Sequence, residues 1–219
     1  MLADGEPNPI DVVRASACPF ARLARLEVTE PIRLDGSGVR YPQTLASAFD
    51  DFTLHNCTEV LDGVIVPIET TTTVSITRLS RILFSVLTIL REHDRANDAA
   101  LLENIESEDW DFDYSGLRFF ILALSPSYPS SNTRHCDSGT TSYLLFQPEN
   151  SFRRFGISSK HPNRELISQR IRRLFSSRGQ VYDDEVTLKL PKIYRYIMRA
   201  TPAQAPVRWW SIKTSSERW

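Results

Sequence analysis

The residues best suited to chemistry gather in one stretch rich in serine and proline, SPSYPSSNTRHCDSGT (125–140). His135 stands in this stretch beside Arg134, and a neutral imidazole has a nitrogen lone pair that can coordinate haem iron. A planar guanidinium suits a carboxylate, so Arg134 could pair with a haem propionate. Coordination of haem iron is therefore one interpretation of His135. The alternative is a loop histidine that only hydrogen-bonds to the backbone.

Cysteine provides a second kind of ligand. Cys18 lies in a Cys-Pro-Phe corner, and a thiolate on haem iron favours oxygen activation. The alternative for Cys18, as for Cys136 beside His135, is a buried thiol that packs as a small hydrophobe. Cys57 completes an odd count of three with no CxxC pair, which favours a reducing compartment over disulfides or structural zinc.

The other histidines have simpler interpretations. His93 falls near the end of a predicted helix, where a cation is favoured by the helix dipole. His161 precedes Pro162 in a polar turn and is expected to be exposed, and His55 follows an apolar helix face. No HxxxH or HxD spacing supports a zinc or non-haem iron site built from them.

Two apolar runs flank the reactive stretch and are expected to hold it. Residues 119–124 and 143–146 resemble buried strands, and such a pair supports a polar loop rigidly. The sequence FQPENSF (146–152) follows the second run. Its Glu149 could receive a polar substrate, or Pro148 and Glu149 could simply begin a helix.

Periodicity predicts the remaining elements. Thr44–Leu61 and Val74–His93 have helical spacing of apolar residues, with an N-cap for the second expected among 70–73. Gly63–Ile68 reads as a strand, which Pro67 would place at a sheet edge. Arg164–Arg178 reads as a basic amphipathic helix ending at Gly179. Its expected buried face consists of Leu166, Ile167, Ile171, Leu174 and Phe175.

Composition places the chain among soluble globular proteins. The 219 residues suit one domain (1–219) with a loose start (1–10), and strands mixed with helices without strict alternation favour an α+β fold. We expect a small mixed sheet flanked by helices. A net charge of −1 gives no support for nucleic-acid binding. The N-terminus does not resemble a signal peptide, and no apolar run suits a membrane span, so we expect a cytoplasmic protein.

Four segments together resemble the YqcI/YcgG family. They are ACPFA (17–21), RFFILALSPSYPSSNTRH (118–135), YLLFQPENSF (143–152) and PVRWW (206–210). The family comprises small haem proteins of bacterial natural-product pathways. The resemblance implies haem b held at the edge of the sheet, with His135 as the axial ligand and Arg134 as a propionate partner. Cys18 matches the family's early Cys-Pro corner, and Trp209 would be either a core residue or part of the haem wall.

The resemblance also implies an activity. Such proteins hydroxylate guanidine or amine nitrogens of amino acids, and the sequence is most similar to the D-cycloserine-pathway type. This implies L-arginine as substrate and Nω-hydroxy-L-arginine as product, with a redox partner or peroxide as the source of oxidising equivalents. A guanidinium substrate requires a carboxylate, for which Glu149 and Asp137 lie nearest His135 in sequence. Asp109, Asp111 and Asp113 are further options, and each could equally be a solvated surface residue.

Other functions remain open at this level. A haem carrier or gas sensor would bind the same cofactor without turnover. A colourless binding protein would use the loop only structurally, and a non-haem metal enzyme would contain metal without porphyrin. The aromatic C-terminal segment around Trp209 and Trp210 could contribute to a homodimer.

Overall fold

Three long strands form the centre of the sheet. In the computed structural model, β4 (Gly63–Thr70), β7 (Ser142–Pro148) and β6 (Leu117–Leu124) lie side by side, and both contacts are antiparallel. The structure describes residues 7–35, 38–56, 59–94, 96, 101–108, 110–157 and 162–211. The predicted strands 119–124 and 143–146 are thus confirmed as direct neighbours. Residues 143–146 are buried, and residues 119–124 are buried on one face and partly buried on the other.

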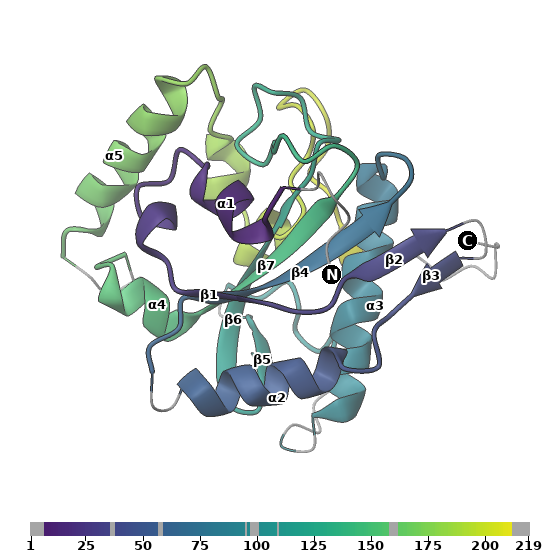
Figure 1. Cartoon of the computed structure of the whole chain (residues 1–219). Helices are drawn as coiled ribbons and strands as arrows, with labels where there is room; N and C mark the ends of the chain where they lie inside the picture. The colour runs from purple at the N-terminus through teal and green to yellow at the C-terminus, as the bar shows by residue number, and fades with distance from the viewer. Residues whose placement is uncertain are drawn as a thin grey trace.

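Shorter strands extend the sheet on either side. They are β1 (Leu26–Val28), β2 (Ile32–Asp35), β3 (Gly38–Arg40) and β5 (Phe112–Tyr114). The strand order is β3-β2-β4-β7-β6-β5, and β1 also pairs with β4. Since β1 and β2 run parallel to β4 while the other pairs are antiparallel, the sheet is mixed. The fold is a single α+β domain with a curled sheet and flanking helices (Figure 1), as predicted.

The prediction that Pro67 marks an edge strand was wrong, because β4 is central. The Ile65 carbonyl accepts a bond from the Thr29 amide at 2.9 Å, so Ile65 directs its backbone groups toward the β1 side. Successive residues of a strand direct their backbone N–H and C=O groups to alternate neighbours, so Pro67, two residues after Ile65, also faces the β1 side. There it lies opposite the break between β1 and β2, where Pro31 interrupts the neighbouring chain. The missing N–H of Pro67 consequently removes no ladder hydrogen bond.

Helices cover both faces of the sheet (Figure 1). The α-helices are α1 (Pro9–Arg14), α2 (Leu45–Asn56), α3 (Ile76–His93), α4 (Glu149–Arg154) and α5 (Arg164–Ser176). Short helical turns are η1 (Ala21–Leu23), η2 (Glu185–Lys189), η3 (Lys192–Arg195) and η4 (Trp209–Ser211). The main core includes residues of α2, α3 and the C-terminal segment, whereas a smaller cluster joins α1 to the opposite face.

The long helix α3 bears out its predicted pattern. The expected apolar face is fully buried, consisting of Leu79, Ile82, Leu83, Val86, Leu87 and Leu90. The N-cap is Ser75, whose hydroxyl accepts the Arg78 amide at 3.2 Å, and not a residue of 70–73. His93 is the last helical residue, as expected, and lies 3.4 Å from Asp50. No helix in the described part of the chain is long and apolar enough to cross a membrane.

The outer helix α5 is less buried than predicted. Leu166 is 68% exposed and Phe175 is the buried residue of the helix, so the expected apolar face was wrong at its N-terminal end. Gly179 follows the helix with φ of +73°, and the Gln180 amide bonds back to the Phe175 carbonyl at 3.0 Å. The glycine stop was therefore predicted correctly.

Both ends of the described chain are packed. Pro9 and Ile10 already belong to α1, and Pro9 is buried; residues 1–6 of the segment expected to be loose lie outside the described residues. Trp209 is fully buried, and its indole N–H donates to the Ile193 carbonyl at 3.0 Å. Trp210 is 8% exposed. These two side chains thus pack within the chain, and the possible homodimer stays a prediction.

A buried ion pair fixes the C-terminal segment. The Arg199 guanidinium donates two bonds to Asp183, at 2.6 and 2.9 Å, and one to Glu185 at 2.6 Å. Its remaining Nη1 donates to the Gln204 carbonyl at 2.8 Å. Burial alone would raise the pKa of Asp183, but the bonds from Arg199 hold that pKa below its ordinary value. The arrangement satisfies the charges fully, as a buried pair requires.

Replacing Arg199 by Ala should cost about 3–5 kcal/mol of unfolding free energy, because Asp183 would be left buried without a counter-ion. Urea unfolding followed by circular dichroism measures the loss. The matched control is Arg33→Ala, which removes an ion pair to Glu69 from a side chain that is 66% exposed. That change should cost less than about 1 kcal/mol. Equal losses in the two variants would contradict the structural role assigned to Arg199.

Candidate functional site

The loop between β6 and β7, residues 125–141, is firmly held at one end of the sheet. Asn132 is central, because its side-chain amide donates to the carbonyls of Arg199 and Ala200 at 3.0 Å each. Its Oδ1 accepts the Arg134 amide at 2.9 Å. Ser131 accepts the Val181 amide at 2.6 Å. The β6–β7 loop is therefore a defined support for its side chains, as expected from the two flanking strands.

His135 is oriented through both ring nitrogens. Nδ1 lies 2.7 Å from the Tyr128 carbonyl oxygen and Nε2 lies 3.0 Å from Asp137 Oδ1. A carbonyl can only accept, so Nδ1 must carry the proton. The Asp137 carboxylate can also only accept, so the contact at Nε2 requires a proton on that nitrogen as well. When this contact is broken and the imidazole is neutral, the lone pair is on Nε2, the tautomer that a backbone-oriented metal-binding histidine uses.

The contact at Nε2 is the weaker of the two. The Asp137 side chain is fully exposed, whereas His135 is 20% exposed. An ion pair with a fully exposed partner contributes little and is readily broken by rotation of the carboxylate. Nε2 is thus open to a ligand once Asp137 turns away. Asp137 and His135 are brought together, as their spacing suggested.

Arg134 reaches a distant segment of the chain. Its Nη2 donates to the Arg195 carbonyl at 3.2 Å, and its Nε is shielded from solvent with no hydrogen-bond partner among the described residues. Burial lowers the pKa of Arg134, while Tyr128, Tyr182 and Cys18 act in the opposite direction. No described carboxylate forms an ion pair with it. The described residues therefore leave the Arg134 charge without a carboxylate partner.

Cys18 lies within the electrostatic reach of Arg134, although the two are far apart in sequence. Burial raises the pKa of the Cys18 thiol; bonds from the Phe20 and Ala21 amides, and the Arg134 charge, oppose the rise without cancelling it. A thiol with a raised pKa is a poor source of thiolate at neutral pH. The described surroundings of Cys18 thus do not favour its thiolate form.

Cys136 has the packing role that was one of its predicted alternatives. Its side chain is buried in the smaller cluster with Val12 and Val13 of α1. Burial raises the pKa of the Cys136 thiol to about 11, and its sulfur lies 3.2 Å from the Ser138 hydroxyl. Three other residues weighed from the sequence, Cys57, Asp109 and His161, lie outside the described residues.

Glu149 is not brought to the loop. It begins α4 after β7, at the far end of that strand from the loop, and β7 alone spans roughly 20 Å. Its carboxylate accepts a bond from Arg153 at 3.1 Å. The helix-start interpretation of this motif is confirmed. Nearness in sequence was misleading because β7 lies between the loop and Glu149 and carries the chain to the opposite end of the sheet.

Trp209 and the other aspartates also lie apart from His135. Trp209 is in the main core, where its ring stacks on Tyr196 with centroids 6.0 Å apart. Asp111 pairs with Lys192 at 2.9 Å and Arg118 at 3.1 Å beside β5. Asp113 accepts the Gly116 amide at 3.2 Å in the turn between β5 and β6. The described contacts of these side chains include none to His135.

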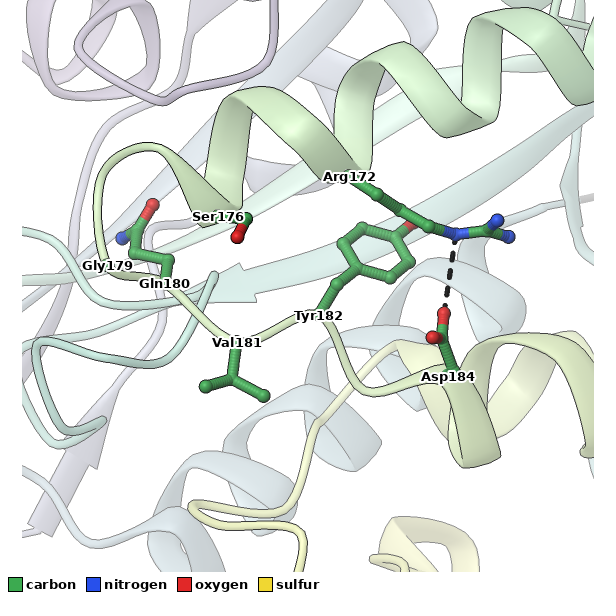
Figure 2. A pocket seen from close by; sticks show the side chains of 7 residues that line it. All are labelled: Arg172, Ser176, Gly179, Gln180, Val181, Tyr182 and Asp184. Carbon is green, nitrogen blue, oxygen red and sulfur yellow. Dashed lines mark ion pairs between the residues drawn. The ribbon is translucent and has the colours of Figure 1, made fainter.

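A groove lies between α5 and the chain that follows it (Figure 2). Its volume is about 410 Å³, and it is lined by Arg172, Ser176, Gly179, Gln180, Val181, Tyr182 and Asp184. The Tyr182 ring lies under α5 with the Arg172 side chain running past it, and Arg172 pairs with Asp184 at 3.3 Å. No sequence pattern predicted this groove, because none of its residues forms a recognisable motif. The backbone bond between Val181 and Ser131 places it next to the β6–β7 loop.

Comparison with known proteins supports one assignment. The family model of the YqcI/YcgG family matches residues 41–187. The chain belongs to the YqcI/YcgG family. The match includes Arg134, His135 and Asp137, whereas Cys18 and Trp209 lie outside it. No curated protein and no solved structure matches the chain.

Among the described residues, no group of three or more His, Cys, Asp and Glu side chains is arranged to hold a metal ion. Haem iron requires fewer ligands from the protein, since the porphyrin supplies four and one imidazole can supply a fifth. The oriented His135 and the unneutralised Arg134 fit such a group, whose propionates are anions. The residues of the β6–β7 loop are therefore chemically suited to haem.

Alkylation of Cys18 tests the electrostatics of this region. Because the pKa of its thiol is raised, the rate with iodoacetamide should reach half its maximum above the ordinary cysteine pKa. Arg134→Gln should move that midpoint higher still, since a neighbouring positive charge is lost. Mass spectrometry of the Cys18 peptide separates it from the other cysteines.

The matched control is Arg178→Gln. Arg178 is exposed and donates to the Ala15 carbonyl at 2.7 Å, close to Cys18 in sequence. Its removal should leave the alkylation midpoint where it is in the unmodified protein. A midpoint below the ordinary cysteine pKa, or a downward shift in Arg134→Gln, would contradict the assigned environment.

Proposed function

We propose that this protein is a haem-dependent N-oxygenase that hydroxylates a guanidine or amine nitrogen of an amino acid. The substrate we favour is L-arginine, converted to Nω-hydroxy-L-arginine in an antibiotic pathway of the D-cycloserine type. Family membership and the similarity of the loop motif support the class. The observation that carries the proposal is the His135 imidazole, whose Nδ1–H is fixed by the Tyr128 carbonyl at 2.7 Å.

Each residue of the site has a stated part in the proposal. His135 would bind the iron through Nε2, and the Tyr128 carbonyl would hold the ring in the required tautomer. Arg134 would neutralise a propionate. When bound, haem supplies the activation of dioxygen or peroxide. The protein supplies the ligand, the orientation of the substrate nitrogen and the exclusion of water.

Asp137 contacts the nitrogen of His135 that would bind iron. In the structure it occupies Nε2 of His135, so it must rotate away when that nitrogen binds iron. Of the two carboxylates first considered for the substrate guanidinium, only Asp137 lies beside His135, whereas Glu149 lies at the far end of β7. Because Asp137 would share the His135 side of the porphyrin, it would act on the imidazole and would not hold the nitrogen that is oxidised.

An absorption spectrum tests the cofactor and its ligand together. Protein purified from haem-replete cells should show a Soret band, and His135→Ala should lose it because the iron loses its imidazole. His93→Ala is the matched control, since His93 is half-exposed and pairs with Asp50 away from the loop. It should keep the band unchanged. Asp137→Ala should also keep the band, because it frees Nε2.

Addition of L-arginine separates an oxygenase from a haem carrier or sensor. In an oxygenase the substrate should shift the Soret band, and Nω-hydroxy-L-arginine should appear by mass spectrometry when a reductant with oxygen, or peroxide, is supplied. A coloured protein that gives no product with L-arginine or other amino-acid amines would indicate a carrier. Colourless protein from haem-replete cells would rule the proposal out.

A further inference from the structure

Tryptophan and tyrosine rings form a continuous row through the C-terminal part of the core. The ring centroid of Trp110 lies 6.1 Å from that of Tyr196, and the Tyr196 ring stacks on Trp209 with centroids 6.0 Å apart. Trp209 in turn contacts Trp210, with centroids 5.7 Å apart. Indole and phenol rings lose a single electron more readily than other aromatic side chains, and electrons pass readily between rings at such spacings. The row can therefore carry oxidising equivalents through the protein.

The row passes beside the β6–β7 loop. The Tyr196 carbonyl accepts a hydrogen bond from the Ala123 amide at 3.1 Å, just before the loop begins. Within the loop, Arg134 donates to the Arg195 carbonyl at 3.2 Å, and Tyr196 is the next residue of the chain. Covalent bonds and a single hydrogen bond thus connect His135, the neighbour of Arg134, to the Tyr196 ring.

The hydrogen-bond partners of the two indoles differ, and this difference gives the row a direction. The Trp209 N–H donates to the Ile193 carbonyl at 3.0 Å. A backbone carbonyl does not take up a proton at neutral pH, so oxidised Trp209 keeps its proton and remains a strong oxidant. The Trp210 N–H donates to the Glu106 carboxylate at 3.1 Å. Oxidation makes an indole N–H strongly acidic and a carboxylate can accept its proton, so the oxidised state settles on Trp210 as a neutral radical.

The end of the row at Trp210 lies at the surface. Trp209 is fully buried, whereas Trp210 is 8% exposed. The Glu106 side chain that holds the Trp210 N–H is exposed, and it also pairs with the exposed Arg208. A soluble reductant can therefore reach the pair of Trp210 and Glu106 but not Trp209.

We propose that Trp209 and Trp210 form a relay that carries unused oxidising equivalents from the β6–β7 loop to the surface. Trp210 loses one electron through Trp209 to the oxidising site, which is reduced by one electron, and the Trp210 N–H proton passes to Glu106. A soluble thiolate then returns the electron, and Glu106 returns the proton. This use of the relay rests on the proposed function, because bound haem would supply the oxidising equivalent when no substrate nitrogen takes it.

The distribution of oxidised residues tests the relay without the cofactor. Azide radicals remove single electrons from indoles of the full chain, purified without added haem, and mass spectrometry locates the stable products. Trp110 is more exposed than Trp210, yet Trp210 should hold most of the product because the oxidised state moves to it through Trp209. Trp209→Phe should shift the product to Trp110. All variants also contain Trp219→Phe, since Trp219 lies outside the described residues.

Matched variants separate the relay from simple exposure to the oxidant. Glu106→Gln removes the proton acceptor and should lower the Trp210 product. Arg208→Gln breaks the same ion pair but leaves the carboxylate, so it should retain the Trp210 product. Tyr196→Phe keeps the stacked ring and loses only a hydroxyl that donates to the Phe119 carbonyl, so it should leave the distribution unchanged.

Two results would overturn the relay. A Trp210 product that persists in Trp209→Phe would mean that the oxidant reaches Trp210 directly from solvent. An equal loss of this product in Glu106→Gln and Arg208→Gln would identify the lost ion pair, and not the lost proton acceptor, as the cause.

The link to the β6–β7 loop has its own measurement. In haem-loaded protein given peroxide without L-arginine, Trp209→Phe should lose the Soret band faster than the unmodified protein, because the oxidising equivalents stay at the site. Equal rates of loss would overturn the link. These results are separate from the proposed function, since a protein without haem fails that proposal while the distribution of oxidised tryptophans still decides the relay.

Discussion

The antiparallel pairing of β6 with β7 is the constraint on which the site depends. The two strands pair from Phe119 opposite Pro148 to Leu124 opposite Tyr143, in the middle of the sheet, so the loop that joins them cannot shift without breaking the core. Asn132 then ties that loop to the C-terminal segment through two carbonyls. These contacts fix the backbone positions of His135 and Arg134. The polar loop 125–141 is held in place because its backbone and side chains bond to the C-terminal segment as well as within the loop.

Two neighbouring residues of the loop have opposite electrostatic situations. His135 lies near the surface and is held by one backbone carbonyl, so its second nitrogen remains open to exchange. Arg134 points to the interior and retains a charge that no described carboxylate neutralises. Arg199, a few residues from Arg195, is a structural arginine. It donates two hydrogen bonds to the Asp183 carboxylate, and its third nitrogen donates to the Gln204 carbonyl. Arg134 and Arg195 differ from Arg199, because Nε of each has no hydrogen-bond partner among the described residues.

Sequence patterns predicted the elements that have strong local signals. The strands around 119–124 and 143–146, helix α3 and the stop at Gly179 follow from apolar runs, helical spacing and a glycine with positive φ. Predictions failed where a neighbour far along the chain decides the outcome. Pro67 is central because β1 and β2 leave a break opposite it, and Leu166 is exposed because α5 packs through its C-terminal end. Glu149 was predicted to lie near His135 because the two are close in sequence, although the whole of β7 separates them. The bond from Arg134 to the Arg195 carbonyl was not predicted, because no local pattern links residues that are 61 positions apart.

The bond between His135 and haem iron is the central claim, and vibrational spectroscopy tests it most directly. In His135→Gly the cavity left by the side chain should accept free imidazole and regain the cofactor. Resonance Raman spectra of the reduced variant should then contain an iron–imidazole stretching band that moves when the added imidazole carries ¹⁵N. A band that does not respond to the isotope, or a variant that holds haem equally well without imidazole, would show that the iron is bound from elsewhere in the fold.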